Sequence, residues 1–400
     1  MRSSVGYGVG VALRSGAMPL LMGMRWIAGA ARDDRIGVPS TRWDIKLAAK
    51  VALDEFFFAT ELASASIVSL RDGRGLGEEV VETAAFFRKR GWIDHPASYH
   101  EAPPPLEMLS RQDHPSSPMG PYQLLRFESG YEPHPGEPGR ERWLGYRANR
   151  IAHARLWVHR GPPRPWLVCI PGYRMGRLSV DFTGFRVRWL HRELGLNVAI
   201  PVMPLHGPRS QGRRGGDGFL SGNFVDTVHA QTQAAWDVRR LIDWLRAYGA
   251  PAVGIHGVSL GGYTAALVAS LDSKLDCAIA GIPPTCFLRL LRSQLPRFLL
   301  QVLEKTQYPL DRVEEILSVT SPLALTPALP RERRFLYAGV ADQLASPDQA
   351  RDLWRHWGRP RMAWYDGSHV SFVWEPEVES LVREAVIATG LAPRNLPQLG

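Results

Sequence analysis

Five short runs of consecutive apolar residues, separated by helical stretches, constrain the fold of this chain more than any other feature. Strands that are buried on both faces have this pattern, and parallel sheets are built from such strands. The stretches between them, notably 224–248 and 263–271, imply repeated strand–helix–strand units. The five runs are 166–170, 197–202, 252–256, 277–282 and 335–341. The sequence therefore predicts an α/β domain from about 122 to 395, with a mostly parallel central sheet flanked by helices.

The N-terminal part of the chain has a different pattern. Segments 44–66 and 77–90 carry apolar residues at helical spacing, and the second ends in a basic turn before Gly91, which suits a helix C-terminus. Prolines then recur with Ser and Asp from 103 to 121, which favours irregular extended chain. We therefore expect residues 1–121 to form an N-terminal helical extension with a Pro-rich linker.

Composition limits the classes of partner. Hydrophobic residues at 45% and charged residues at 22% are typical of globular proteins. Cys169, Cys277 and Cys286 lie in apolar surroundings and suggest neither disulfides nor a thiolate metal site, so we expect a reducing, cytoplasmic compartment. The net charge of +9 comes from basic residues spread along the chain, without a basic stripe interleaved with aromatics, which argues against nucleic-acid binding.

Residues 1–31 are largely apolar, but Arg14 and Arg25 interrupt them. Neither a transmembrane span nor a secretory signal is therefore expected. We expect one or two helices packed on the body of the protein. The alternative is a helix lying on a membrane surface, which would make the protein peripheral to a membrane.

Gly257-Val-Ser-Leu-Gly261 joins an apolar strand to an Ala-rich helix. Gly-x-Ser-x-Gly in a strand–turn–helix setting is typical of a nucleophile elbow, in which a strained turn exposes the serine hydroxyl. Glycines two residues to either side remove side chains that would collide with the neighbouring strand and helix. Ser259 is therefore the candidate nucleophile, and an inert serine in a Gly-rich turn is the alternative.

A serine nucleophile needs a general base. His356 and His369 are the only histidines after Ser259. His356 lies in a stretch where apolar and charged residues alternate at helical spacing, which predicts a helix surface. His369 follows the short apolar segment 362–365 in a loop after a predicted strand, so we expect His369 to be the base.

The base in turn needs a carboxylate to orient it. Asp342 directly follows the predicted strand 335–341, at the sheet edge where the elbow is expected. Two rivals have simpler interpretations. Asp348 lies in Ser-Pro-Asp-Gln, a capping box at a helix start, and Asp366 precedes Gly367 as a turn former.

Ser259, Asp342 and His369 occur in the order and strand contexts of the α/β-hydrolase superfamily, which the chain resembles over about 122–390. The resemblance implies an eight-stranded, mostly parallel sheet and a serine that forms an acyl-enzyme intermediate. A serine at this position argues against the dehalogenase and epoxide-hydrolase members, which use a carboxylate.

The resemblance also implies an oxyanion hole, because acyl transfer develops negative charge on the carbonyl oxygen. One donor is the backbone N–H of Leu260, directly after the nucleophile. The second is the backbone N–H of Tyr173, where Pro171-Gly172 replaces the His-Gly that the family often has. The phenol of Tyr173 could add another donor, and packing of its ring on the domain is the alternative.

Two further segments are candidates for the walls of the site. Loops at the carboxyl ends of strands approach the site in open α/β sheets, so Arg209, Arg213 and Arg214 could meet a carboxylate or phosphate on the substrate. A solvated loop is the alternative. The insertion 284–330, rich in Leu and Phe with interspersed Arg, is a candidate helical lid with an apolar inner face, and plain packing on the sheet is its alternative.

These features predict a serine hydrolase that cleaves a carboxylic ester, from a small-molecule or lipid-like substrate. The same triad would also serve an acyltransferase, a thioesterase or a peptidase, and a non-catalytic binding protein on a hydrolase fold is the alternative from another class. The sequence contains no HExxH, no clustered Cys and His, and no GxGxxG after a strand, so we expect neither metal nor cofactor.

Overall fold

The computed structural model describes residues 37–41, 44–64, 73–294 and 308–393. Residues 1–31, with their expected packed or membrane-surface helices, lie outside these ranges. So do the central residues of the lid insertion, 295–307. Among the helices of the described ranges, none is both long enough and apolar enough to cross a bilayer.

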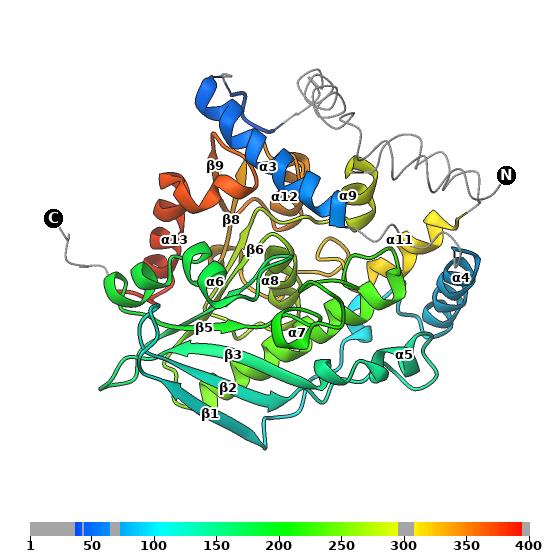
Figure 1. The fold of residues 1–400 in the computed structure, drawn as a ribbon, viewed down its shortest axis with the longest axis horizontal. Helices are drawn as coiled ribbons and strands as arrows, with labels where there is room; N and C mark the ends of the chain where they lie inside the picture. Colours follow the sequence, from blue (N-terminus) through cyan, green and yellow to red (C-terminus); the bar gives the residue numbers. More distant parts are fainter. Residues whose placement is uncertain (1–36, 42–43, 65–72, 295–307, 394–400) are drawn as a thin grey trace.

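The described residues form one sheet with the strand order β1-β2-β3-β5-β4-β6-β7-β8-β9 (Figure 1). Its strands are β1 Leu109–His114, β2 Tyr122–Glu128, β3 Ile151–Trp157, β4 Trp166–Ile170, β5 Asn197–Pro201, β6 Val253–Val258, β7 Cys277–Gly281, β8 Arg334–Gly339 and β9 Arg361–Tyr365. The strands from β5 across to β9 pair in parallel. β1, β2 and β3 add an antiparallel edge beyond β5. The predicted mostly parallel α/β sheet is confirmed.

Helices connect the strands and cover both faces of the sheet. They are α3 Ile45–Ser64, α4 Gly73–Lys89, α5 Arg140–Gly145, α6 Leu178–Gly184, α7 Phe224–Ala247, α8 Leu260–Leu271, α9 Phe287–Gln294, α11 Leu310–Ser318, α12 Pro347–His356 and α13 Pro376–Ala388. Short 3-10 turns supplement them, among them η6 Val370–Trp374.

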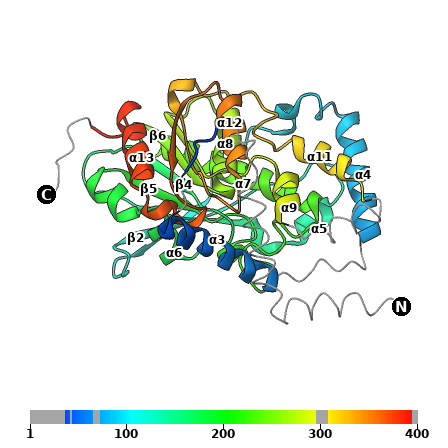
Figure 2. The same ribbon diagram turned by 90° about the horizontal axis from the view of Figure 1, so that it is seen from above.

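The burial pattern explains why the strands were visible in the sequence. The five apolar runs form β4 to β8, and every residue of β4, β5, β6 and β7 is buried. β3 behaves differently, because Ala152, Ala154 and Leu156 are buried and alternate with more exposed residues. Within β4, Val168 and Ile170 join the core beneath α7 and α8, while Leu167 and Cys169 join the core beneath α13. Figure 2 shows the strands between these two helix layers.

One expectation for the linker is wrong. Residues 103–121 contain β1, which pairs antiparallel with β2 along its length. Most of its residues are exposed, so no alternation of apolar and polar residues marks it. Backbone pairing with β2, and not side-chain burial, accounts for this strand, and β1 makes the sheet nine-stranded instead of the eight strands that the resemblance implied.

In the described part of the N-terminal extension, α3 and α4 lie in the two segments that were expected to be helical. α4 begins at Gly73, four residues before the expected start, and Gly91 after it has the left-handed φ of 72°. The two helices lie at different places on the molecule (Figures 1 and 2). α4 packs against α11 and α7, whereas α3 packs against η6, the turn that follows the last strand of the sheet.

Candidate active site

Ser259 occupies the sharp bend between β6 and α8. Its backbone has φ 54° and ψ −120°, a conformation that non-glycine residues rarely adopt. The Ser259 N–H donates to the carbonyl oxygen of Gly281, 2.9 Å away on β7, which anchors the bend to the sheet. The serine is partly exposed although the residues on both sides of it are buried. The bend therefore presents the hydroxyl outward, as a nucleophile elbow does.

The glycines around the serine are required by close backbone contacts. A Cβ on Gly257 would lie 1.9 Å from the carbonyl oxygen of Gly261, and a Cβ on Gly261 would lie 1.9 Å from that of Ile170. Gly262 is also constrained, since its Cβ would come within 2.5 Å of the carbonyl oxygen of Gly281. The steric reason given for the Gly-x-Ser-x-Gly spacing holds in the structure.

The ends of three strands bring Ser259, His369 and Asp342 together. His369 Nε2 lies 2.8 Å from Ser259 Oγ, and His369 Nδ1 lies 2.7 Å from Asp342 Oδ2. Both distances are within the range in which a general base can act. His369 is 8% and Asp342 3% exposed, so this chain of hydrogen bonds is largely shielded from water.

Asp342 is held by its own loop, residues 340–345, which we call the acid loop. Asp342 Oδ1 accepts the backbone N–H groups of Leu344 and Ala345, both at 2.8 Å, which leaves Oδ2 for the imidazole. The loop that carries His369, residues 366–370, is the histidine loop. The two loops touch directly, since the N–H of Ala341 donates to the carbonyl oxygen of Gly367 at 3.0 Å.

The charges around His369 favour the protonated form of its imidazole. Burial lowers the pKa of His369, but the Asp342 carboxylate, its hydrogen bond to the ring and the charge of Asp54 raise it more, so the net shift is upward from 6.5. With Nδ1–H donated to Asp342, the neutral imidazole turns its Nε2 lone pair toward Ser259. That tautomer can accept the serine proton.

The rival acids and base lie elsewhere. Asp348 pairs with Arg289 at 3.0 Å, and Asp366 is exposed. His356 ends α12, where its Nε2 lies 2.8 Å from the carbonyl oxygen of Leu325. These residues do not contribute to the cluster around Ser259.

The capping box expected at the start of α12 is wrong in its side-chain details. Pro347 begins the helix as expected, but the side chain of Ser346 makes no capping hydrogen bond. Gln349 Oε1 instead accepts the backbone N–H groups of Thr285 and Cys286, both at 2.9 Å. The side chain of Gln349 thus contacts the segment before α9 and does not take part in the expected cap at the start of its own helix.

The loop after β4 packs directly on the elbow. A Cβ on Gly172 would lie 3.0 Å from the carbonyl oxygen of Val258 and 3.2 Å from Ser259 Cβ. This closeness brings the backbone that follows Gly172 alongside the serine, and Leu260 is the first residue of α8. Leu260 and Tyr173 therefore border the candidate nucleophile from two sides, and their roles as oxyanion donors stay a prediction.

His206 and Arg174 hold this loop in place, a feature that the sequence did not reveal. Arg174 has the positive φ of 65°, and its N–H donates to His206 Nε2 at 3.3 Å. Its guanidinium lies 4.7 Å from the ring centre of Tyr173 and pairs with Asp217 at 2.6 Å. The Tyr173 ring also packs edge-on against His206, which fits the packing interpretation of that side chain.

Of the three candidate arginines, Arg209 requires correction. Its side chain is fully buried, pairs with Asp237 at 2.8 Å and donates to the carbonyl oxygens of Val202 and Asn149. The buried carboxylate and carbonyls hold the two terminal nitrogens of this side chain inside the protein, so Arg209 is not available to a substrate. Arg213 and Arg214 are exposed on the following loop, where a substrate contact stays a prediction.

The described part of the lid insertion contributes to packing. Phe287 of α9 is 4% exposed and stacks on Tyr263 of α8, with ring centres 4.4 Å apart. His256, on the strand before the elbow, is also a core residue, because its Nε2 bonds the Tyr337 hydroxyl at 3.0 Å.

In the described ranges, no group of three or more His, Cys, Asp or Glu side chains is placed to hold a metal ion.

Asp54 of α3 is the residue that sequence reasoning missed. Its carboxylate is completely buried and accepts backbone N–H groups from both the acid loop and the histidine loop. A signal existed in the sequence, because Asp54 follows the apolar residues Leu47 by seven and Val51 by three positions. That spacing puts an acid on the face of a helix that apolar residues would otherwise fill.

Comparison with solved structures identifies the fold. Acetyl xylan esterase 1 from Thermoanaerobacterium sp. JW/SL YS485 superposes with a TM-score of 0.50 at 13% identity, covering 76% of this chain and 93% of that chain. At that identity the likeness concerns the fold alone. Together with the parallel sheet and the elbow, it defines an α/β-hydrolase fold.

Comparison with other sequences identifies the family. Two Mycobacterium tuberculosis proteins, "Uncharacterized protein MT2702" of strain CDC 1551 / Oshkosh and "Uncharacterized protein Rv2627c" of strain ATCC 25618 / H37Rv, are each 39% identical over 391 residues. The match covers 95% of this chain and 93% of each relative. The chain therefore belongs to the family of these two mycobacterial proteins. No family model matches it.

Proposed function

We propose that the protein is a serine hydrolase that cleaves a carboxylic ester through an acyl-serine intermediate. The observation that carries this proposal is the position of the His369 imidazole, 2.8 Å from Ser259 Oγ on one side and 2.7 Å from Asp342 Oδ2 on the other. A serine hydroxyl gains nucleophilicity from a base in this position, and the base keeps its tautomer through the carboxylate.

In the acylation step, His369 Nε2 takes the proton of Ser259 Oγ as the oxygen attacks the ester carbonyl carbon. The negative charge that develops on the carbonyl oxygen is met by the backbone N–H groups of Leu260 and Tyr173. When the tetrahedral intermediate collapses, the ester C–O bond breaks and His369 gives its proton to the departing alcohol. Asp342 stabilises the transient imidazolium and does not itself take a proton.

In the deacylation step, water replaces the alcohol and His369 removes its proton as the water attacks the acyl carbon. When the second tetrahedral intermediate collapses, the bond between the acyl carbon and Ser259 Oγ breaks, His369 gives its proton to Oγ, and the acid is released. A small-molecule or lipid-like ester is the proposed substrate.

The test is covalent labelling with a fluorophosphonate, combined with turnover of p-nitrophenyl esters of graded acyl length. Ser259→Ala should abolish labelling and lower ester turnover by at least about 10³-fold, as loss of a serine nucleophile does in enzymes of this kind. Ser98→Ala is the matched control, because Ser98 is exposed and its hydroxyl donates to the carbonyl oxygen of His95, three residues earlier.

Undiminished labelling of Ser259→Ala would remove the proposal. Product analysis with added alcohols, thiols and peptides separates hydrolysis from acyl transfer. A hydrolase releases free acid whatever acceptor is present.

A further inference from the structure

We propose that Asp54 is a positioning residue for His369, so that α3 of the N-terminal extension forms part of the catalytic apparatus. This inference rests on the proposed function of Ser259, His369 and Asp342. Asp54 does not touch the serine. It acts through the backbone of the two loops that carry the base and its acid.

The Asp54 carboxylate connects the two loops. Its Oδ2 accepts the N–H of His369 at 2.8 Å and that of Gln343 at 3.2 Å, while its Oδ1 accepts the N–H of Val370 at 2.9 Å. Gln343 directly follows Asp342 in the chain. One buried carboxylate therefore holds the backbone next to the base and the backbone next to the acid at the same time.

This placement determines where the imidazole can lie. The bond to the N–H of His369 fixes the residue whose ring must reach both Ser259 and Asp342, over a sequence separation of 315 residues from Asp54. A displacement of the order of 1 Å at a catalytic group lowers the rate roughly 10²-fold. Loss of a carboxylate that fixes this backbone should therefore slow turnover.

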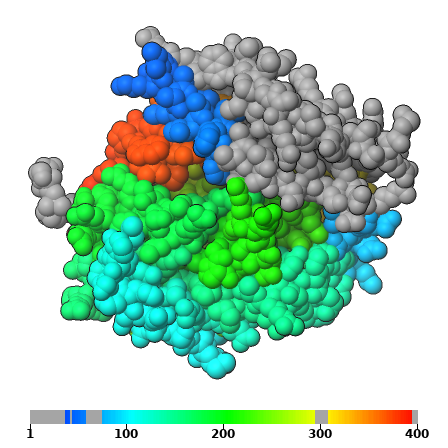
Figure 3. Space-filling model, viewed as in Figure 1, coloured from blue at the N-terminus to red at the C-terminus, as the bar shows by residue number. Residues whose placement is uncertain are grey.

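Other residues of α3 press the same face of the helix onto the same loops. Lys50, one turn before Asp54, pairs with Glu375 at 2.7 Å and donates to the carbonyl oxygen of Asp366 at 2.8 Å. Leu47 and Val51 form a small buried cluster with Ala341 of the acid loop. In Figure 3 the surface of α3, in blue, borders the orange surface of the C-terminal part of the chain.

The charges around Asp54 indicate that its ionisation affects the base. Burial raises its pKa to about 6, and the charge of Asp342 contributes to this rise, whereas His369 and the backbone N–H groups lower it. Other titratable groups among the described residues near it are the buried phenol of Tyr365 on β9, the neighbouring Glu55 and the Lys50–Glu375 pair. An ionised Asp54 stabilises the imidazolium, since its charge raises the pKa of His369.

The experiment compares Asp54→Asn with Asp44→Asn. Both variants make the same chemical change on α3 or at its first turn, but Asp44 is exposed at the start of the helix, and its carboxylate accepts the N–H of Leu47 within that turn. Asparagine caps helices about as well as aspartate, so Asp44→Asn should behave as wild type. Ester kinetics and fluorophosphonate labelling rates are measured across the acidic and neutral range and normalised to the fraction of protein that labels.

We expect Asp54→Asn to lower kcat/KM by roughly 10- to 100-fold, mainly through kcat, because the amide cannot accept all three N–H groups and the base is misplaced. The acid limb of the kcat/KM profile should move to lower pH, because loss of a nearby negative charge lowers the pKa of His369. The imidazole titration followed by NMR in the Ser259→Ala background should move the same way, independently of turnover.

Three outcomes would overturn the inference. The first is Asp54→Asn with wild-type kcat and an unshifted profile. The second is a loss of activity that merely follows the loss of folded protein, which would make Asp54 a packing residue. If Asp54→Asn does not fold, Lys50→Met replaces it, because loss of the Lys50 contacts loosens α3 from the histidine loop. The third overturning outcome is then a wild-type kcat in Lys50→Met.

The two proposals fail separately. Wild-type protein that does not react with the fluorophosphonate contradicts the proposed function itself. Wild-type protein that reacts, together with Asp54→Asn that reacts equally fast at every pH, contradicts only the role of Asp54.

Discussion

The two helices of the N-terminal extension serve different parts of the molecule. α3 places Lys50 and Asp54 against the loops that carry His369 and Asp342. α4 buries Val80, Ala84 and Phe87 in the main hydrophobic core, next to α7 and α11. The two helices thus differ in what they contact: α3 binds the backbone of the two loops through Asp54, whereas α4 adds its apolar side chains to the main core.

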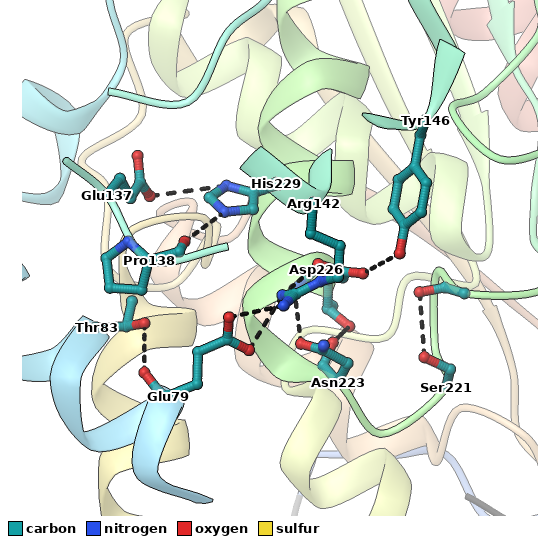
Figure 4. Close-up of polar contacts among 12 residues, drawn as sticks. Glu79, Thr83, Glu137, Pro138, Arg142, Tyr146, Ser221, Asn223, Asp226 and His229 are labelled. Atoms are coloured by element: carbon teal, nitrogen blue, oxygen red, sulfur yellow. Dashed lines mark hydrogen bonds and ion pairs between the residues drawn. The ribbon is translucent and has the colours of Figure 1, made fainter. Parts of the chain in front are cut away.

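An ion-pair network fastens α4 to the body of the protein (Figure 4). Arg142 of α5 donates to Glu79 of α4 at 2.8 Å and to Asp226 of α7 at 2.8 Å. Asp226 also accepts the Tyr146 hydroxyl at 2.8 Å. This network joins three helices, and its residues are distinct from those that contact the acid and histidine loops. The comparison teaches that the contacts a helix makes, with the loops after β8 and β9 for α3 or with α7 and α11 for α4, decide whether it serves the site, and not its place in the chain.

The sharpest test of this difference removes apolar contacts from each helix in turn. Leu47→Ala on α3 should cost about 2–3 kcal/mol of unfolding free energy and Val80→Ala on α4 about 1–3 kcal/mol, since both side chains are buried. Only Leu47→Ala should also lower kcat of the folded protein, because it loosens the helix that carries Asp54. Urea unfolding and normalised ester kinetics measure the two effects. Equal kcat in both variants would erase the distinction between the helices.

The pH dependence of stability should separate two buried acids. Burial raises the pKa of Asp54 to about 6 and that of Glu137, near α4, to about 7. When the pKa of an acid is higher in the folded protein than in the unfolded chain, the protonated acid favours the folded state. This contribution is fully present below about pH 4, the ordinary pKa range of these acids, and is lost as pH rises through the folded-state pKa.

The amides in Asp54→Asn and Glu137→Gln do not ionise, so each variant keeps part of the stability that wild type loses. Relative to wild type, the unfolding free energy of each variant should therefore rise by about 2 kcal/mol as pH increases. Only Asp54→Asn should also shift the activity profile. Thermal unfolding at pH values on either side of the transition measures the first effect. A shift of the activity profile in Glu137→Gln would show that a buried charge near α4 also acts on the base.

The smallest effect is expected from the ion-pair network. Arg142→Met should cost about 1–2 kcal/mol, less than a fully buried pair because the Arg142 side chain is 36% exposed. The control is Arg361→Met, whose pair with Glu384 is exposed and should change stability by no more than about 0.5 kcal/mol. Both variants should keep wild-type kcat, and a clear drop in Arg142→Met would mean that α4 is coupled to the site.

Part of the candidate site was predictable because its residues follow strands with strong local signals. Ser259 comes between an apolar strand and an Ala-rich helix, and His369 and Asp342 lie in the loops that follow β9 and β8. Parallel strands end at one edge of a sheet, so the order of these residues along the chain already indicated that they meet.

Other features had no such signal. β1 is an exposed edge strand whose only regularity is its backbone pairing with β2. Arginine is usually a surface residue, yet Arg209 lies in the interior, where it pairs with Asp237 and donates to two backbone carbonyl oxygens. The capping box before α12 was displaced by a contact between Gln349 and the chain at Thr285. In each case a partner distant in the sequence decided the outcome.

The sequence by itself determined the parallel sheet, the elbow and the choice of Ser259, His369 and Asp342, because hydrophobic periodicity and the steric demands of glycine act over a few residues. Only the tertiary structure decided that α3 docks on the acid and histidine loops and that Asp54 accepts their backbone N–H groups. Backbone N–H groups are the same at every residue, so no local pattern records which distant carboxylate will bind them.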